Sequence, residues 1–254
     1  MKKNRYACIT GATSGIGYAF AKQLDRRGYN LILVGRNEAK LREVSKKFAN
    51  KCEFIVCDLS DTQKCIELGR ILKERNFDVF INNAGFGDLG AFYETDLDKD
   101  LSMINVNVTA MHILTKYVLQ NFMEKDSGYI LNVASSAGLM PGGPYMSTYY
   151  ASKAYITSMT TAIWEELKEK HSNVSISMLC PGPVDTNFNN VANVNFALPG
   201  IQASYCVSYA LKQMFRRKLT IVPSLTMKIA VTGSRFLPRQ VLAAVTARQQ
   251  HKKM

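Results

Sequence analysis

The chain contains no Cys-x-x-Cys pair, and this absence argues against both a zinc site and a redox-active disulfide. Most of its cysteines fall in apolar, strand-like contexts, so we expect them to be reduced and mostly buried. The histidines are few and show no spacing typical of a metal site or a nucleophilic triad. We therefore expect no metal. The residues concerned are Cys8, Cys52, Cys57, Cys65, Cys180, Cys206, His112, His171 and His251.

Long hydrophobic runs are also missing. No uninterrupted apolar stretch reaches the roughly 18 residues expected of a membrane-spanning helix. The N-terminus runs from Met1 directly into the strand-like stretch 6–10, which leaves no room for a secretory segment. No linker, low-complexity tract or fixed-period repeat divides the chain. We expect a single domain over 1–254 and a soluble, cytoplasmic protein.

Acidic residues are outnumbered: 32 Lys and Arg face 20 Asp and Glu, for a formal net charge of +12. Much of the excess lies in 216–218 and in the tail 248–253. A solvated basic face, an anionic cofactor, an anionic membrane and a nucleic acid would each account for it. No helix-turn-helix, zinc-finger or aromatic RNA-binding signature is present, so we expect no nucleic-acid partner. Weak peripheral membrane contact through the basic C-terminal region stays open.

Short β-branched and aliphatic runs alternate with segments of helical period along the chain. This alternation predicts parallel strands joined by right-handed crossovers. The fold class is thus α/β, a Rossmann-type, doubly wound, seven-stranded parallel sheet with helices on both faces. The predicted strands are 6–10, 31–34, 53–57, 79–82, 129–133, 174–179 and 219–222, and the predicted helices are 15–27, 38–49, 62–75, 97–124, 149–170 and 202–216.

The first strand leads into a glycine turn, Thr10-Gly11-Ala12-Thr13-Ser14-Gly15-Ile16-Gly17, which opens the first helix. Glycines there permit a tight turn and let backbone N–H groups and the helix N-terminus approach a pyrophosphate. A glycine triplet alone is a weak signal, and a plain glycine-rich loop is the alternative. The strand before it and the helix after it favour dinucleotide binding.

Arg36 follows the second strand, where folds that prefer NAD(H) place an acidic residue for the ribose hydroxyls. Its forked guanidinium suits the additional 2′-phosphate of NADP(H), so we expect NADP(H) to be preferred over NAD(H). The alternative is that Arg36 merely begins the next helix in solvent.

Polar residues also follow later strands. Asp58 is placed to accept a hydrogen bond from an adenine amino group, or to cap a helix. Asn82 begins the stretch Asn82-Asn83-Ala84-Gly85, which would line the cofactor cleft, brace the strands or simply turn. The segment 181–186 is a rigid turn that could bring Thr186 to the nicotinamide carboxamide.

Tyr149 and Lys153 stand four residues apart on a predicted helix, so they share a face. A fixed cation beside a phenol favours the phenolate and would lower the pKa of the phenol into a range useful for acid/base catalysis. Ser136, thirteen residues before Tyr149, follows the fifth strand and could stabilise the oxygen on which charge develops. An isolated tyrosine–lysine pair would be an ordinary exposed helix face; the convergence with Ser136 and the glycine turn favours a catalytic site.

These motifs together resemble the short-chain dehydrogenase/reductase family, in its compact single-domain form. The segments TGATSGIG, NNAG, YxxxK and PGPVDT occur in the family's order. The resemblance implies that Tyr149 is the acid/base, that Lys153 lowers its pKa and holds the nicotinamide ribose, that Ser136 polarises the carbonyl, and that Asn107 holds a water in a proton relay. The cofactor positions that it implies are Gly11, Thr13, Ser14, Gly15, Ile16, Gly17, Arg36, Asp58, Leu59, Asn82, Ala84, Gly85, Tyr149, Lys153, Pro181, Gly182, Val184 and Thr186.

The expected reaction is NADPH-dependent reduction of a ketone or aldehyde. A lid over 187–205 carries several apolar residues, which favours a hydrophobic substrate of steroid-like or ketoacyl-like type. The stretch 223–254 is predicted as a helical extension with a basic tail. The resemblance also implies a homodimer or homotetramer. The rivals are a non-catalytic NADP(H) sensor, which would usually lose the tyrosine or lysine, and a basic membrane-associated protein.

Overall fold

The computed structural model describes residues 5–186 and 200–251. Its main sheet has seven parallel strands in the order β3-β2-β1-β4-β5-β6-β9. The order reverses between β1 and β4, which is the point where doubly wound sheets bind ligands beyond the carboxyl ends of their strands. The strands are β1 (Tyr6–Thr10), β2 (Asn30–Gly35), β3 (Cys52–Val56), β4 (Val79–Asn82), β5 (Gly128–Val133), β6 (Val174–Leu179) and β9 (Thr220–Ile221).

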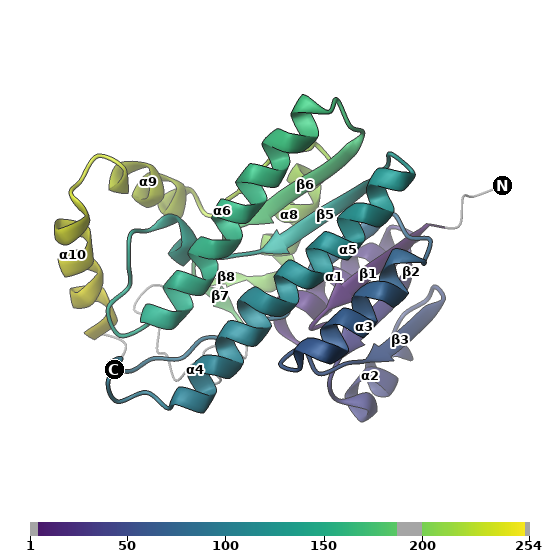
Figure 1. Cartoon of the computed structure of the whole chain (residues 1–254), viewed down its shortest axis with the longest axis horizontal. Helices are drawn as coiled ribbons and strands as arrows, with labels where there is room; N and C mark the ends of the chain where they lie inside the picture. Colours follow the sequence, from purple (N-terminus) through teal and green to yellow (C-terminus); the bar gives the residue numbers. More distant parts are fainter. Residues whose placement is uncertain (1–4, 187–199, 252–254) are drawn as a thin grey trace.

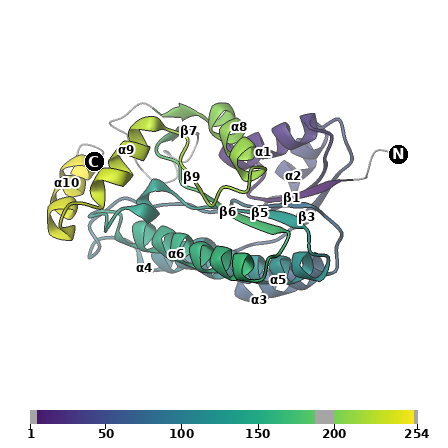
Figure 2. The same ribbon diagram turned by 90° about the horizontal axis from the view of Figure 1, so that it is seen from above.

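Helices cover both faces of this sheet, as the sequence predicts (Figure 2). On one side lie α1 (Gly15–Arg26), α2 (Glu38–Ser45) and α8 (Ala203–Met214). On the other lie α3 (Thr62–Lys73), α4 (Leu97–Ile104), α5 (Met111–Glu124) and α6 (Ser147–Glu169). Each side has its own buried core because alternate side chains of a strand point to opposite faces.

Two details differ from the sequence-based expectation. The single helix expected over 97–124 is divided, since the six residues Asn105–Ala110 form a π-helix between α4 and α5. Val184–Asp185 (β7) also pairs with Ile201–Gln202 (β8) in a small second sheet, which fixes the segment after β6. The lid expected over 187–205 lies outside the described residues between 187 and 199.

The predicted C-terminal extension consists of α9 (Leu225–Ser234) and α10 (Arg239–His251). In Figure 1 these helices stand at the end of the molecule opposite the N-terminus, beyond α6. Of the helices described, none is long and apolar enough to cross a membrane.

A buried hydrogen-bonded chain holds the two central strands against the helices. The Asn82 amide donates to Thr115 Oγ1 over 3.2 Å, and Thr115 Oγ1 donates to Asn132 Oδ1 over 3.1 Å. The Asn132 amide donates in turn to Thr160 Oγ1 over 3.0 Å. These four side chains satisfy one another's hydrogen bonds, and they connect β4 and β5 to α5 and α6.

Candidate active site

The glycine turn after β1 has the backbone that its sequence predicts. Gly11 and Gly15 adopt positive φ angles of 65° and 53°, which residues with a side chain rarely adopt. A Cβ at Gly17 would lie 2.2 Å from the Gly11 carbonyl oxygen, so only glycine fits there. Ser14 precedes α1 without a side-chain cap, and the first helical turn contains no acidic residue. This helix start is therefore suited to an anionic group.

The Asn82–Gly85 segment is locked onto that turn. The Asn83 amide donates to the Thr10 carbonyl over 2.9 Å, and the backbone N–H groups of Asn83 and Ala84 both donate to Thr10 Oγ1. Asn82 itself points inward, where its amide donates to Thr115 and to the Met111 carbonyl. Of the alternatives for this stretch, bracing of the strands therefore describes the Asn82 side chain, and its predicted cofactor contact has no support from the side-chain geometry.

Arg36 is exposed at the end of β2 and does not belong to α2, whose N-cap is Asn37. Its charge helps to lower the pKa of Asp58, after the larger effect of hydrogen bonds from Ser60. Arg36 and Asp58 therefore share one rim of the sheet. The helix-capping alternative for Asp58 does not hold, since Asp61 caps α3 and Asp58 accepts hydrogen bonds from the Ser60 N–H and hydroxyl. Leu59, beside it, is buried.

The turn after β6 reaches the glycine turn from the other side. An ideal Cβ at Gly15 would lie 3.4 Å from Thr186 Cβ, so Thr186 packs directly against the start of α1. The Pro181 carbonyl accepts a hydrogen bond from the Ser136 N–H, and Val184 is buried. The predicted cofactor positions in 11–17, 84–85 and 181–186 thus converge on one place, and a dinucleotide fits their glycine backbone and open helix start.

Tyr149 and Lys153 lie on α6 beside this place, and both are at least nine-tenths buried. Lys153 Nζ lies 5.9 Å from the centre of the Tyr149 ring and donates to the Val133 carbonyl over 3.0 Å. The predicted proximity of the amine and the tyrosine ring is therefore present.

In this structure burial outweighs the predicted effect of that proximity on the pKa of the Tyr149 phenol. Burial raises the pKa of the Tyr149 phenol to about 12, and no effect of Lys153 offsets it. Burial also lowers the pKa of Lys153 to about 8. Both groups lose water, and desolvation penalises the charged form of each, so the lysine is a weakened cation rather than a strong one. The phenol stays protonated at neutral pH.

The serine that contacts Tyr149 is Ser135, whereas the spacing of thirteen residues pointed to Ser136. A hydrogen bond from the Ser135 hydroxyl lowers the pKa of Tyr149, partly opposing the effect of burial. Ser135 is extended, caps the short 3₁₀ helix Ser136–Leu139, and its Oγ also accepts from the Ala137 N–H. Successive side chains of an extended backbone point to opposite sides, so a one-residue difference decides which serine faces the tyrosine.

Two glycines allow neighbouring segments to pack closely around Lys153. A Cβ at Gly138 would lie 2.4 Å from the Lys153 carbonyl oxygen, so the segment after β5 packs directly on the α6 backbone. A Cβ at Gly85 would lie 2.8 Å from Asn107 Oδ1 and 3.1 Å from Lys153 Nζ. Gly85 therefore lies between the amide of Asn107 and the amine of Lys153.

Asn107 is fully buried in the π-helix between α4 and α5, an irregularity that is frequent at functional sites. Its side chain is bound on both sides by protein groups. Oδ1 accepts from the Phe86 N–H over 3.0 Å, and Nδ2 donates to the Phe86 carbonyl and to Ser152 Oγ. The side chain thus fixes the loop after β4 to α6.

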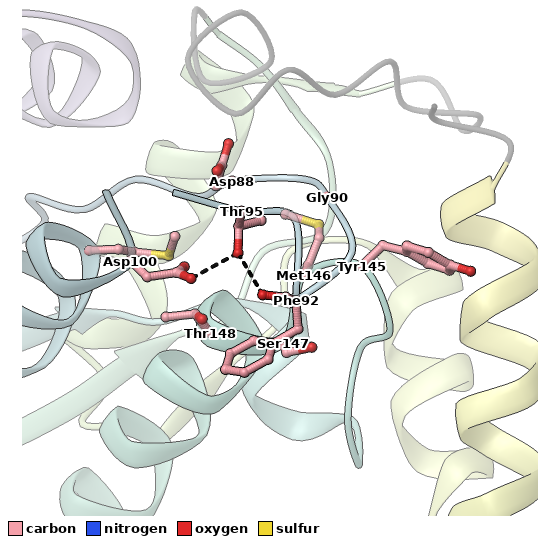
Figure 3. A pocket seen from close by; sticks show the side chains of 10 residues that line it. Asp88, Gly90, Phe92, Thr95, Asp100, Tyr145, Met146, Ser147 and Thr148 are labelled. Atoms are coloured by element: carbon pink, nitrogen blue, oxygen red, sulfur yellow. Dashed lines mark hydrogen bonds between the residues drawn. The ribbon is translucent and has the colours of Figure 1, made fainter. Parts of the chain in front are cut away.

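The loop after β4 meets the segment that precedes α6. Gly90, after β4, donates a backbone hydrogen bond to Tyr145 over 2.8 Å. Figure 3 shows Thr95 pointing to Asp100 beneath this junction, with an Oγ1–Oδ2 distance of 2.9 Å. The small cavity there measures about 10 Å³, room for no more than one water, so it is not a substrate pocket.

A larger, open cleft of about 500 Å³ lies beside the segment 140–147. Its walls come from that segment, from α6 and from α10, and are mostly apolar. The residues that line it include Met140, Gly143, Pro144, Tyr150, Ala154 and Ala243.

Comparison with known proteins agrees with this geometry. The family model for short chain dehydrogenases matches residues 5–195. The chain belongs to the short-chain dehydrogenase family. Its members are oxidoreductases, and the seven-stranded sheet with the crossing order described above is their fold.

Two curated relatives and one solved structure are similar to this chain. A very-long-chain 3-oxoacyl-CoA reductase of Anas platyrhynchos is 31% identical over 203 residues, which are 76% of this chain and 64% of the relative. The inactive hydroxysteroid dehydrogenase-like protein 1 of Homo sapiens is 32% identical over 196 residues, 74% of this chain and 58% of the relative. The chain thus spans about 60% of the length of these curated relatives. A short-chain dehydrogenase from Sphingobium yanoikuyae, solved with NADPH, superposes with a TM-score of 0.81 at 28% identity, over 91% of this chain and 93% of that one.

The choice between the two serines is testable with a matched pair of variants. We expect Ser135→Ala to lower kcat/KM for a ketone by about 10²–10³-fold, because it removes a hydrogen-bond donor beside the phenol. Ser136→Ala should change kcat/KM little. Steady-state kinetics of both variants would show the opposite ranking if the spacing, and not the contact with Tyr149, identified the functional serine.

The burial of Lys153 should lower the free energy of unfolding. At pH 7 Lys153 is protonated in both the folded and unfolded states, and its burial disfavours the folded one. Lys153→Met should therefore raise the free energy of unfolding at pH 7 by about 1–3 kcal/mol while abolishing turnover. Between pH 8 and the ordinary lysine pKa of 10.5, the folded wild type binds fewer protons than the unfolded chain, so its stability rises with pH and the difference between variant and wild type shrinks.

Chemical denaturation of both proteins across this pH range measures the effect. Lys168→Met, on an exposed part of the same helix, is the control and should leave stability almost unchanged. A Lys153→Met protein that is less stable than wild type at pH 7 would contradict the interpretation.

Proposed function

We propose that the protein is an NADP(H)-dependent carbonyl reductase that acts on a hydrophobic ketone or aldehyde. The observation that carries the proposal is the buried, hydrogen-bonded Tyr149–Ser135 pair beside the glycine turn, with Lys153 at its side. This arrangement supplies a neutral proton donor and a second hydroxyl at one place. The name of the duck relative, a 3-oxoacyl-CoA reductase, is consistent with this reaction.

In the proposed mechanism a substrate carbonyl oxygen lies between the hydroxyls of Ser135 and Tyr149. A bound NADPH supplies the hydride that reduces the carbonyl carbon. Tyr149 donates its proton to the oxygen as negative charge develops there, so the carbonyl gains one hydride and one proton and becomes an alcohol. The raised pKa of Tyr149 keeps the phenol loaded with a proton at neutral pH, which suits the reductive direction.

Lys153 and Asn107 support these two hydroxyls. With its pKa lowered to about 8, Lys153 is able to release a proton near neutral pH more readily than an ordinary lysine, which suits resupply of the phenol. Asn107 is a positioning residue in this proposal. Its side chain binds Phe86 and Ser152, and Ser152 Oγ donates to the Tyr149 carbonyl over 2.7 Å, so Asn107 holds the backbone that carries the phenol.

The preference for NADP(H) rests on Arg36. Its exposed guanidinium stands at the end of β2, the position where folds that prefer NAD(H) place an acidic residue for the ribose hydroxyls. The relative from Sphingobium was solved with NADPH, which is consistent with this choice.

A hydrophobic substrate of steroid-like or ketoacyl-like type is supported by the name of the Anas platyrhynchos relative, a very-long-chain 3-oxoacyl-CoA reductase. The apolar cleft of about 500 Å³ is lined by Tyr150, Ala151 and Ala154 of α6, so it adds an apolar surface beside the proposed site. A homodimer is supported by exposed apolar side chains on α4, namely Leu97, Leu101 and Ile104.

The second candidate is a non-catalytic NADP(H)-binding protein. The name of the human relative marks that protein as inactive, which keeps a non-catalytic role open for this chain. Here the tyrosine, the lysine and a hydroxyl partner are all present and in contact, which favours an enzyme.

The decisive experiment is NADPH oxidation with a panel of ketones, aldehydes and 3-oxoacyl thioesters. On any substrate found, Tyr149→Phe should reduce turnover by about 10³-fold, because it removes the proton donor, and should leave the NADPH dissociation constant nearly unchanged. Tyr155→Phe, on the exposed side of α6, is the control. Wild-type turnover in Tyr149→Phe would refute the assignment, and NADPH binding without turnover on every carbonyl would favour the non-catalytic protein.

Cofactor choice has its own test. Arg36→Ala should weaken NADPH binding by about tenfold or more, since it removes a charged partner of the 2′-phosphate, and should affect NADH binding much less. Fluorescence titration with both dinucleotides measures the ratio. Lys46→Ala, an exposed cation at the far end of α2, controls for general charge loss. Equal losses for NADPH and NADH would show that Arg36 does not recognise the phosphate.

A further inference from the structure

The basic charge of the chain is concentrated in its last quarter. No aspartate or glutamate occurs after Asp185, whereas ten lysines and arginines do, and the first 185 residues are left with a net charge of only +2. A solvated surface normally mixes both signs of charge. The complete loss of acidic residues over this stretch therefore needs a physical reason.

The same part of the chain exposes large apolar side chains. Phe236, between α9 and α10, is 84% exposed, and its neighbour Leu237 is 50% exposed. Leu225 and Ile229 lie four residues apart on α9, and Val241 and Val245 lie four residues apart on α10, so each pair shares a face of its helix. The exposed residues on this extension are Leu225, Ile229, Phe236, Leu237, Val241 and Val245.

These exposed apolar side chains do not attach the extension to the rest of the protein. Other residues of α9 and α10 make those contacts. Gln250 donates to the Tyr150 hydroxyl over 3.1 Å, and Lys228 donates to the Tyr209 hydroxyl over 2.8 Å. Met227 packs against Gly182, where a Cβ would lie only 2.6 Å from its Cγ. The inner sides of α9 and α10 are thus attached to the fold, and the apolar residues named above face outward.

Cations accompany the exposed apolar residues. Arg235 and Arg239 flank the Phe236-Leu237 pair and are exposed. In Figure 1, α9 and α10 form one end of the molecule, beside the start of α6 where Tyr149 lies. A protruding apolar tip flanked by cations, without nearby acids in the sequence, matches an interfacial membrane anchor in composition.

We propose that α9, α10 and their connection dock on an anionic lipid surface, with Phe236 and Leu237 inserted among the acyl chains and the arginines against phosphate headgroups. A second copy of the same surface would bring cations against cations, which like-charge repulsion opposes. The docking does not depend on the proposed reaction. If that reaction is correct, docking places the apolar cleft walled by Ala243 of α10 next to a source of hydrophobic carbonyl compounds.

Vesicle co-sedimentation tests the proposal with the full chain. We expect binding to phosphatidylcholine vesicles that contain about one-third phosphatidylglycerol, at least about tenfold weaker binding to pure phosphatidylcholine, and loss of binding as salt rises from about 0.1 M to 0.5 M. Leu237→Ser should weaken binding to the anionic vesicles severalfold. Ile71→Ser, a comparably exposed apolar residue on α3, should not.

Charge reversal provides the second arm. Arg235→Glu/Arg239→Glu should abolish vesicle binding, whereas Lys46→Glu/Arg70→Glu, the same change of charge on α2 and α3, should weaken it only slightly. Thermal melts and NADPH titration confirm that each variant is folded, and turnover of a water-soluble ketone without vesicles tests the enzyme separately. Three results would overturn the proposal: no binding to anionic vesicles, equal loss in test and control variants, or tighter binding to duplex DNA that Leu237→Ser leaves unchanged.

Discussion

The contact of α6 with the carboxyl end of β5 is the constraint on which the site depends. Gly138 has no side chain, so the segment after β5 packs directly on the backbone of Lys153. The Lys153 amine then reaches the Val133 carbonyl, and the Tyr149 phenol reaches Ser135. A bulkier residue at Gly138 would separate the helix from the strand and part both pairs, whatever the identity of the polar side chains.

This close packing also explains why the pKa of Tyr149 is raised, although a neighbouring lysine was expected to lower it. The packing that orients the two groups removes water from both, and desolvation raises the pKa of the phenol and lowers that of the amine. Burial therefore dominates over their mutual interaction. What the fold provides is a protonated phenol and a readily deprotonated amine, fixed in place at the expense of stability.

Sequence reasoning found the sheet, and it predicted that the glycine turn, Tyr149 and Lys153 lie near one another, because both inferences depend on local patterns. β1, β4 and β6 begin and end where the apolar runs predict. It failed at Ser135 because a count of residues back from Tyr149 passes through the loop 140–146, whose length no helical or strand period fixes. It also missed the π-helix around Asn107, since the residues of 97–124 fit an ordinary helix and only the contacts with Phe86 and Ser152 show why the backbone departs from one.

The charge composition of the chain changes close to the residue at which the family match ends. The family match ends at residue 195, shortly after the last acidic residue, Asp185. The part within the match carries Tyr149, Lys153 and the glycine turn, and up to Asp185 its acidic and basic residues nearly balance. The described part after it supplies α8 to the buried core and β9 to the main sheet, and its last two helices add a wall of the apolar cleft and an exposed basic surface. Among the described residues, α9 and α10 attach to the fold through Gly182 and Tyr150, neither of which is proposed to transfer a proton. The exposed surface of these two helices can therefore vary in composition without altering Tyr149 or Lys153.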